Sequence, residues 1–145
     1  MTETIAREWI DAINARDLDR LRATLSERFV WELGTARTEG AEQSVEAWRL
    51  WFAGFPDFEF RLERMIVQGG MAASQLRMVG THTGDFQFRG VGSMEAPLPP
   101  TQRRFDLPGC AVHEVSRGRI VHLWAYWDTA TMMRQLGLVP GAPGS

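Results

Sequence analysis

Residues 103–127 read RRFDLPGCAVHEVSRGRIVHLWAYW and contain two long segments around a short turn. Residues 103–115 and 119–127 have the length and the spacing of apolar side chains that are typical of strands with one buried face. The turn at Ser116-Arg117-Gly118 has the residue types of a hairpin connection. This stretch therefore predicts an antiparallel pair of long strands.

Two further strands precede this hairpin. Residues 58–64 alternate apolar and charged side chains, and Gly69-Gly70 turns the chain into a second strand over 71–83. The connection 84–100 contains glycine and proline and is long for a hairpin, as is common for functional lids or mobile loops.

Helical patterns dominate the first part of the chain. Apolar residues with helical spacing predict helices over 4–14 and 42–53, and Asp17 is expected to cap a short helix that turns Leu18, Leu21 and Leu25 inward. A short strand is expected over 29–33 and a last helix over 128–136, where Asp128 is the expected N-cap.

Helices that precede a run of hairpin-connected strands indicate an α+β fold. We expect a curved antiparallel sheet with three N-terminal helices packed on its concave face. Because short helices do not fully cover long twisted strands, we expect a cavity between the two layers. Residues 1–139 are predicted to form a single domain, with a frayed tail at 140–145.

The composition limits the classes of partner. The 145 residues carry a formal net charge of -2, which argues against nucleic-acid binding. The single cysteine allows no intrachain disulfide. No signal peptide or bilayer-spanning run is apparent, so we expect a cytoplasmic protein without a membrane partner. Six Trp and eight Phe against one Tyr favour a thick core or a cavity for a hydrophobic ligand.

Five short motifs occur in order along nearly the whole chain: Phe55-Pro56-Asp57, Gly80-Thr81-His82-Thr83-Gly84, Pro99-Pro100-Thr101-Gln102-Arg103-Arg104-Phe105, Gly118-Arg119-Ile120 and Arg134-Gln135-Leu136-Gly137. Together they resemble the SnoaL-like polyketide cyclase family, within the nuclear transport factor 2-like fold. The resemblance implies a cone-shaped barrel with a deep hydrophobic pocket, and a homodimer formed through the outer face of the sheet. It also implies acid/base chemistry on polyketide intermediates without a cofactor.

The chain departs from the family at two positions. The cyclases use an aspartate on the last strand and a nearby histidine for aldol ring closure. The resemblance places these residues at Ala125 and Ala111, and neither alanine transfers a proton. The fold and the pocket are still expected, whereas the aldol reaction is not.

Histidine is the remaining residue type that transfers protons near neutral pH. His82 and His113 each lie on the side of their expected strand that faces the pocket, so they are the predicted catalytic residues. Each has an alternative role as a buried structural histidine with a backbone partner. His122, Trp124 and Tyr126 are expected on the outer face of the sheet. After the histidines, the carboxylate of Glu32 is the next candidate for proton transfer.

The predicted substrate-binding residues are large apolar side chains of the strands and the third helix: Trp31, Trp48, Phe52, Met78, Leu123 and Trp127. The three histidines have no close His or carboxylate spacing, so no metal and no cofactor are expected. The sequence thus predicts an enzyme that cyclises or isomerises a small hydrophobic, polyketide-type substrate. The alternatives are a non-catalytic carrier of such molecules and an epoxide hydrolase, which would need paired carboxylates around an arginine.

Overall fold

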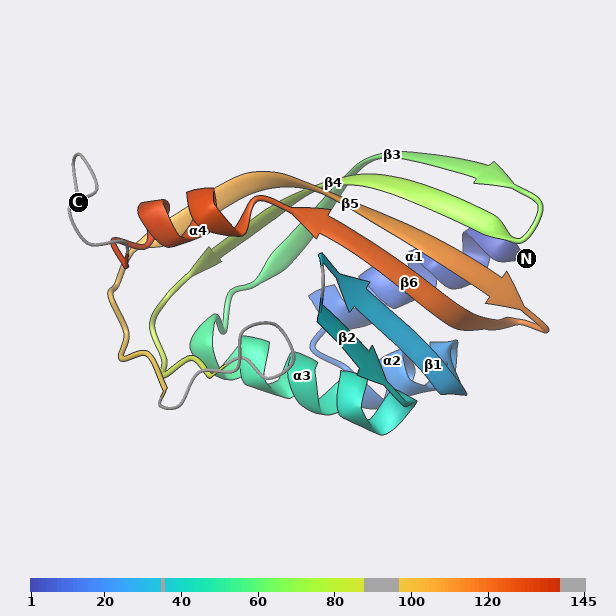
Figure 1. The fold of residues 1–145 in the computed structure, drawn as a ribbon, viewed down its shortest axis with the longest axis horizontal. Helices are drawn as coiled ribbons and strands as arrows, with labels where there is room; N and C mark the ends of the chain where they lie inside the picture. Colours follow the sequence, from blue (N-terminus) through green and yellow to red (C-terminus); the bar gives the residue numbers. More distant parts are fainter. Residues whose placement is uncertain (35, 88–96, 139–145) are drawn as a thin grey trace.

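The computed structural model describes residues 1–34, 36–87 and 97–138 (Figure 1). The helices are α1 (Thr2–Asn14), α2 (Leu18–Thr24), α3 (Ala41–Gly54) and α4 (Thr129–Gln135). The strands are β1 (Leu25–Leu33), β2 (Ala36–Glu39), β3 (Glu59–Gln68), β4 (Met71–Thr81), β5 (Arg104–Ser116) and β6 (Arg119–Trp127). The predicted tail at 140–145 lies outside the described residues, as does most of the predicted loop.

All six strands form one curved sheet in the order β2-β1-β6-β5-β4-β3. Four of the neighbouring pairs are antiparallel, and the three among β3 to β6 were predicted, but β1 runs parallel to β6. β1 also begins earlier than expected, because Leu25, predicted in the second helix, pairs with Ile120 in the sheet. The short strand β2 was not predicted, since its pattern of exposed residues has no buried face. The expected α+β architecture is confirmed.

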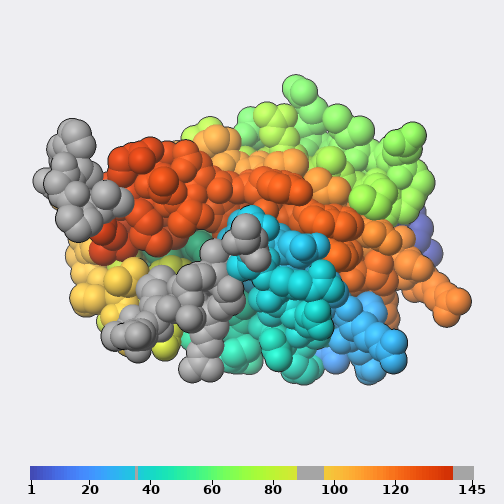
Figure 2. Space-filling model, in the orientation of Figure 1, coloured from blue at the N-terminus to red at the C-terminus, as the bar shows by residue number. Residues whose placement is uncertain are grey.

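Helices α1, α2 and α3 lie against the concave face of the sheet, as Figure 1 shows. Their inward residues are those with helical spacing in the sequence; Trp9 and Ile13 of α1 and Trp48 of α3 are almost completely buried. In Figure 2, β1 and β2 lie between β6 and α3, and strands and helix form a continuous surface on this side; β1 pairs with β6, and β2 pairs with β1. None of the described helices is both long and apolar enough to cross a membrane.

Short oxygen side chains define where two helices begin. The Asp17 carboxylate accepts a hydrogen bond from the backbone N–H of Arg20, and Asp128 accepts one from Thr131. Both predicted N-caps are therefore confirmed. Asp57 lies in the turn before β3, and its carboxylate accepts hydrogen bonds from the backbone N–H and the hydroxyl of Thr81 at 2.7 Å each.

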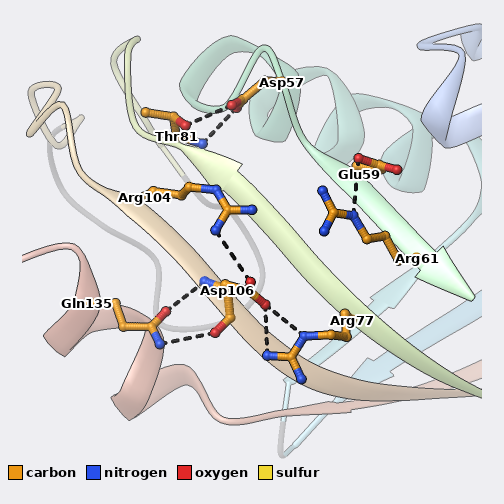
Figure 3. A network of polar contacts seen from close by, with 8 residues as sticks. All are labelled: Asp57, Glu59, Arg61, Arg77, Thr81, Arg104, Asp106 and Gln135. Carbon is orange, nitrogen blue, oxygen red and sulfur yellow. Dashed lines mark hydrogen bonds and ion pairs between the residues drawn. The ribbon is translucent and has the colours of Figure 1, made fainter. Parts of the chain in front are cut away.

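A polar network holds α4 against the end of the sheet (Figure 3). The Asp106 carboxylate on β5 accepts hydrogen bonds from Arg77 and Arg104, which lower its pKa. The side-chain amide of Gln135 accepts from the Asp106 N–H at 2.8 Å and donates to the Asp106 carbonyl at 3.1 Å. Because this amide pairs with the backbone as a neighbouring strand would, it fixes the last helix beside Trp127 at the end of β6.

Asn14 at the end of α1 closes part of the free edge of the sheet. Its amide nitrogen donates to the Phe60 carbonyl at 2.9 Å, and its oxygen accepts from the Phe60 N–H at 2.8 Å. β3 is an edge strand, so these backbone groups have no neighbouring strand to pair with on that side. Asn14 thereby fixes α1 relative to the sheet.

We predict that Asn14→Ala lowers the free energy of unfolding by about 1–3 kcal/mol, because two partly buried backbone groups lose their partner. Urea denaturation followed by circular dichroism measures the change. Asp11→Ala on the exposed face of the same helix is the matched control and should change stability by about 0.5 kcal/mol or less. Equal effects of the two substitutions would show that the Asn14 bridge contributes nothing.

Candidate functional site

A small apolar cavity lies between the helices and the concave face of the sheet. Its volume is about 10 Å³, which is close to the space needed for one water molecule. The lining comes from α1, α3 and five of the strands: Trp9, Trp31, Trp48, Phe60, Leu76, Met78, Cys110, Ala111, Leu123, Ala125 and Trp127. The only ionisable side chain of this lining is Cys110, whose thiol pKa is raised by burial.

The sheet side of the cavity is built from neighbouring inward positions. Ala111 on β5 lies directly opposite Ala125 on β6, and Trp31 on β1 pairs with Leu123. Ala111 and Ala125, the positions where the resemblance led us to expect the family's histidine and aspartate, are thus cross-strand neighbours in the cavity wall. Two methyl groups at this point supply space and no chemistry.

Packed indole rings close the helix side of the cavity. Trp48 stacks on Trp31 with ring centres 5.8 Å apart and an interplanar angle of 10°. Trp9 meets Trp48 edge to face, also at 5.8 Å, and stacks on Phe60 at 5.6 Å. The deep pocket expected from the sequence is therefore mostly filled by aromatic side chains, and any larger ligand enters only if some of these rings move.

Five of the six predicted substrate-binding residues line the cavity: Trp31, Trp48, Met78, Leu123 and Trp127. Phe52 does not. It is half-buried on α3, 6.0 Å from the Trp48 ring, and the Arg16 guanidinium lies over its outer side. Helical spacing placed Phe52 near the inward face but could not show that an arginine covers it.

His113 is completely buried next to the cavity. Its ring meets Trp9 edge to face at 4.8 Å, and neither ring nitrogen has a hydrogen-bond partner within the described residues. Ala72 of β4 and Leu123 of β6 are its strand neighbours. Because no charged group offsets the burial, the pKa of His113 falls from its usual 6.5 to about 4, and the ring is neutral near pH 7.

His82 lies just beyond the end of β4 and does not line the cavity. Its Nδ1 accepts a hydrogen bond from the Thr101 N–H at 3.3 Å and lies 3.2 Å from the Thr101 hydroxyl oxygen. The rings of Phe55 and Phe86 pack against it. Burial is the main cause of its lowered pKa, and the nearby backbone and the charge of Asp85 oppose this shift.

The two predicted catalytic histidines lie at opposite ends of the sheet. The His82 N–H bonds to the carbonyl of Arg103, whereas His113 lies ten positions further along that segment. At about 3.3 Å per strand residue, the separation is on the order of 30 Å. They do not reach the same bond of a small substrate, so the two histidines predicted from the sequence do not form one catalytic site.

A ring nitrogen of His122 and the Glu32 carboxylate are hydrogen-bonded on the outer face of the sheet, where His122 was expected. The His122 ring also stacks on Trp124 at 3.9 Å. Arg37 of β2 lies within 3.9 Å of the same Glu32 oxygen. Because the cavity lies on the concave face of the sheet, the Glu32 carboxylate takes no part in the site.

Sequence reasoning missed Trp9 and Ser74 as site residues. Trp9 carries a clear signal of burial, but only the tertiary structure shows that it both lines the cavity and packs against His113. Ser74 lies opposite Ala111, completely buried, and its hydroxyl is unpartnered within the described residues. In the described part of the chain, no three His, Cys, Asp or Glu side chains come together as a metal site.

The chain belongs to the SnoaL-like polyketide cyclase family, whose model matches residues 3–136. Among curated protein sequences, none is significantly similar to this chain.

Three solved structures illustrate the range of similar folds. A proposed SnoaL-like polyketide cyclase from Jannaschia sp. CCS1 is 23% identical over 96% of this chain and 93% of its own, with a TM-score of 0.81. IdmH, a proposed polyketide cyclase from Streptomyces antibioticus, is 27% identical over 94% and 99%, with a TM-score of 0.75. An LEH-like epoxide hydrolase from M. tuberculosis is 20% identical over 93% and 88%, with a TM-score of 0.70.

We predict that His113 makes the protein less stable in mild acid. The unfolded chain binds a proton at a pKa near 6.5 and the folded protein only near 4, so this contribution to stability is complete above pH 6.5 and falls as the pH drops towards 4. Between pH 7 and pH 5 the loss should be about 2 kcal/mol, measured by urea denaturation at both values.

In His113→Leu this part of the pH dependence should disappear. The matched control is Leu123→Ala, which disturbs the position opposite His113 and should lower stability equally at pH 7 and pH 5. A pH dependence that is the same in His113→Leu and in the wild type would contradict the prediction.

Proposed function

We propose that this protein binds a small hydrophobic, polyketide-type molecule in the apolar cavity and catalyses its cyclisation or isomerisation without a cofactor. The observation that carries the proposal is the position of the cavity. It lies between the helices and the concave face of the sheet, and its lining is apolar apart from the Cys110 thiol. Such a lining favours ligands that are themselves largely apolar.

His113 is the proposed acid or base. It is the histidine next to the cavity, only two residues from Ala111 on the same face of β5. A neutral imidazole accepts a proton at one nitrogen and donates a hydrogen bond from the other. It would remove a proton from the substrate and return it at another position. His82, which was also predicted, is too distant to share this task and is proposed to hold Thr101 in place.

A non-catalytic carrier is the second candidate. It is favoured by the two adjacent alanines in the cavity wall, which leave the expected positions of the aspartate and the histidine without a titrating group. The third expectation, an epoxide hydrolase, finds little support. Among the described residues, neither a carboxylate nor an arginine lines the cavity.

We expect hydroxylated aromatic polyketide precursors to bind and to turn over. Quenching of tryptophan fluorescence measures binding, because four indole rings line the cavity. Turnover is followed by chromatography and mass spectrometry. Ala111→Phe should abolish binding by filling the cavity, and His113→Ala should lower turnover by about 100-fold or more, a larger effect than the roughly tenfold loss of binding that a missing hydrogen bond would produce.

His82→Ala should leave turnover within about threefold of the wild type if the protein folds, because the group that it removes is not at the cavity. Equal loss of turnover in His82→Ala and His113→Ala would contradict the assignment of His113. Binding of every precursor without turnover would contradict the enzymatic function and leave the carrier.

A further experiment tests whether a carboxylic acid at position 125 gives the cavity cyclase activity. If the cavity retains the shape of a cyclase site, Ala125→Asp should produce measurable aldol cyclisation of a precursor that the wild type only binds. Ala125→Asn is the matched control, because it has nearly the same volume and no carboxylate. Activity in both variants or in neither would show that the position does not support cyclase chemistry.

A further inference from the structure

Several buried polar groups next to the cavity have no hydrogen-bond partner within the described residues. They are the Ser74 hydroxyl, both ring nitrogens of His113, and the indole N–H groups of Trp9 and Trp48. Ser74 and His113 are both completely inaccessible to solvent. Buried polar groups are normally paired, because an unpaired one costs stability. Unpaired buried polar groups are expected at functional sites, where a protein binds a ligand.

Ser74 and His113 are diagonal neighbours on the concave face of the sheet. Ser74 pairs with Ala111 across β4 and β5, and His113 pairs with Ala72, so the two residues are offset by two positions. Diagonal neighbours in such a pair are about 7–8 Å apart at their Cα atoms. An oxygen atom that forms hydrogen bonds of about 2.8 Å to each side chain spans up to about 5.6 Å between their polar atoms.

Trp9 borders both the cavity and His113. Its indole ring both lines the cavity and packs edge-on against His113. Ala111, the strand partner of Ser74, is part of the cavity wall and carries only a methyl group. A shift of the Trp9 ring therefore connects the apolar cavity to the two polar side chains.

We propose that Ser74 and His113 form an oxygen-binding subsite at this end of the cavity, which receives a hydroxyl group at one end of an aromatic ligand when Trp9 moves aside. This inference rests on the proposed ligand-binding function and assigns it a specificity. The Ser74 hydroxyl donates a hydrogen bond to the ligand oxygen. The ligand's own hydroxyl group donates a hydrogen bond to the acceptor nitrogen of the neutral His113 ring.

A hydroxyl suits this pair better than a carbonyl oxygen. Neutral imidazole has one donor nitrogen and one acceptor nitrogen, and a serine hydroxyl both donates and accepts. A carbonyl oxygen accepts only, and so leaves the acceptor nitrogen unused. A hydroxyl satisfies an acceptor and a donor at once, which pairs more of the groups that are unpartnered in this structure.

The experiment compares 2-naphthol with naphthalene, which have the same ring system and differ by one hydroxyl. Equilibrium dialysis at pH 7 measures the dissociation constant of each with the full-length protein. We expect the wild type to bind 2-naphthol about tenfold more tightly, as one or two buried hydrogen bonds would produce. The preference should fall to about twofold or less in Ser74→Ala and in His113→Leu, with naphthalene binding retained.

Ser44→Ala is the matched control. It removes the hydroxyl of another buried serine, on α3, and should keep the tenfold preference. Urea denaturation provides a second measurement. Ser74→Ala should be at least as stable as the wild type, because it removes an unpaired buried hydroxyl. A clear loss of stability would show that this hydroxyl has a structural partner, and would overturn the proposal.

The remaining outcomes separate this inference from the proposed function. If the wild type binds both compounds equally, or if the preference survives in Ser74→Ala and His113→Leu, the subsite is wrong and the apolar cavity remains a binding site. If the wild type binds neither compound, the cavity does not open to aromatic ligands, and the proposed function fails together with the subsite.

Discussion

The packing of Trp48 is the interaction on which the rest of the structure depends. Its ring contacts Trp9 of α1, Trp31 of β1, and Phe58 and Phe60 at the start of β3. One side chain therefore joins α3 to α1 and to two distant strands of the sheet, β1 and β3. A curved sheet leaves more space beneath it than short helices fill, and large rings occupy that space with the fewest ordered torsion angles. Trp48 thus determines both the closure of the layers and the size of the cavity.

The same packing explains why helices cover a curved sheet in this protein and yet enclose only a small apolar cavity. Ala125 and Ala111 contribute only methyl groups to the cavity wall, and four indole rings line the same cavity. Ser74 and His113 are the buried polar side chains closest to these alanines along β4 and β5. Trp9 contacts both the cavity and His113, so the proposed access to these polar groups depends on the position of this indole ring.

Local patterns predicted most of the fold because each depends on nearby residues. The period of two in β3 to β6, the glycine turns, and the caps at Asp17 and Asp128 are consequences of backbone geometry and short-range hydrogen bonds. The parallel pairing of β1 with β6 was not predicted, because it joins Leu25 to Ile120 across nearly the whole chain. Neither was β2, whose residues carry no apolar alternation.

The sequence by itself determined the family and the layer order, since these follow from which residues occupy which positions. Only the tertiary structure decided the chemistry that is left. It placed His82 and His113 at opposite ends of the sheet, and it brought Ser74 beside His113. The physical reason is that strand register determines which side chains become neighbours, and register depends on contacts distant in the chain.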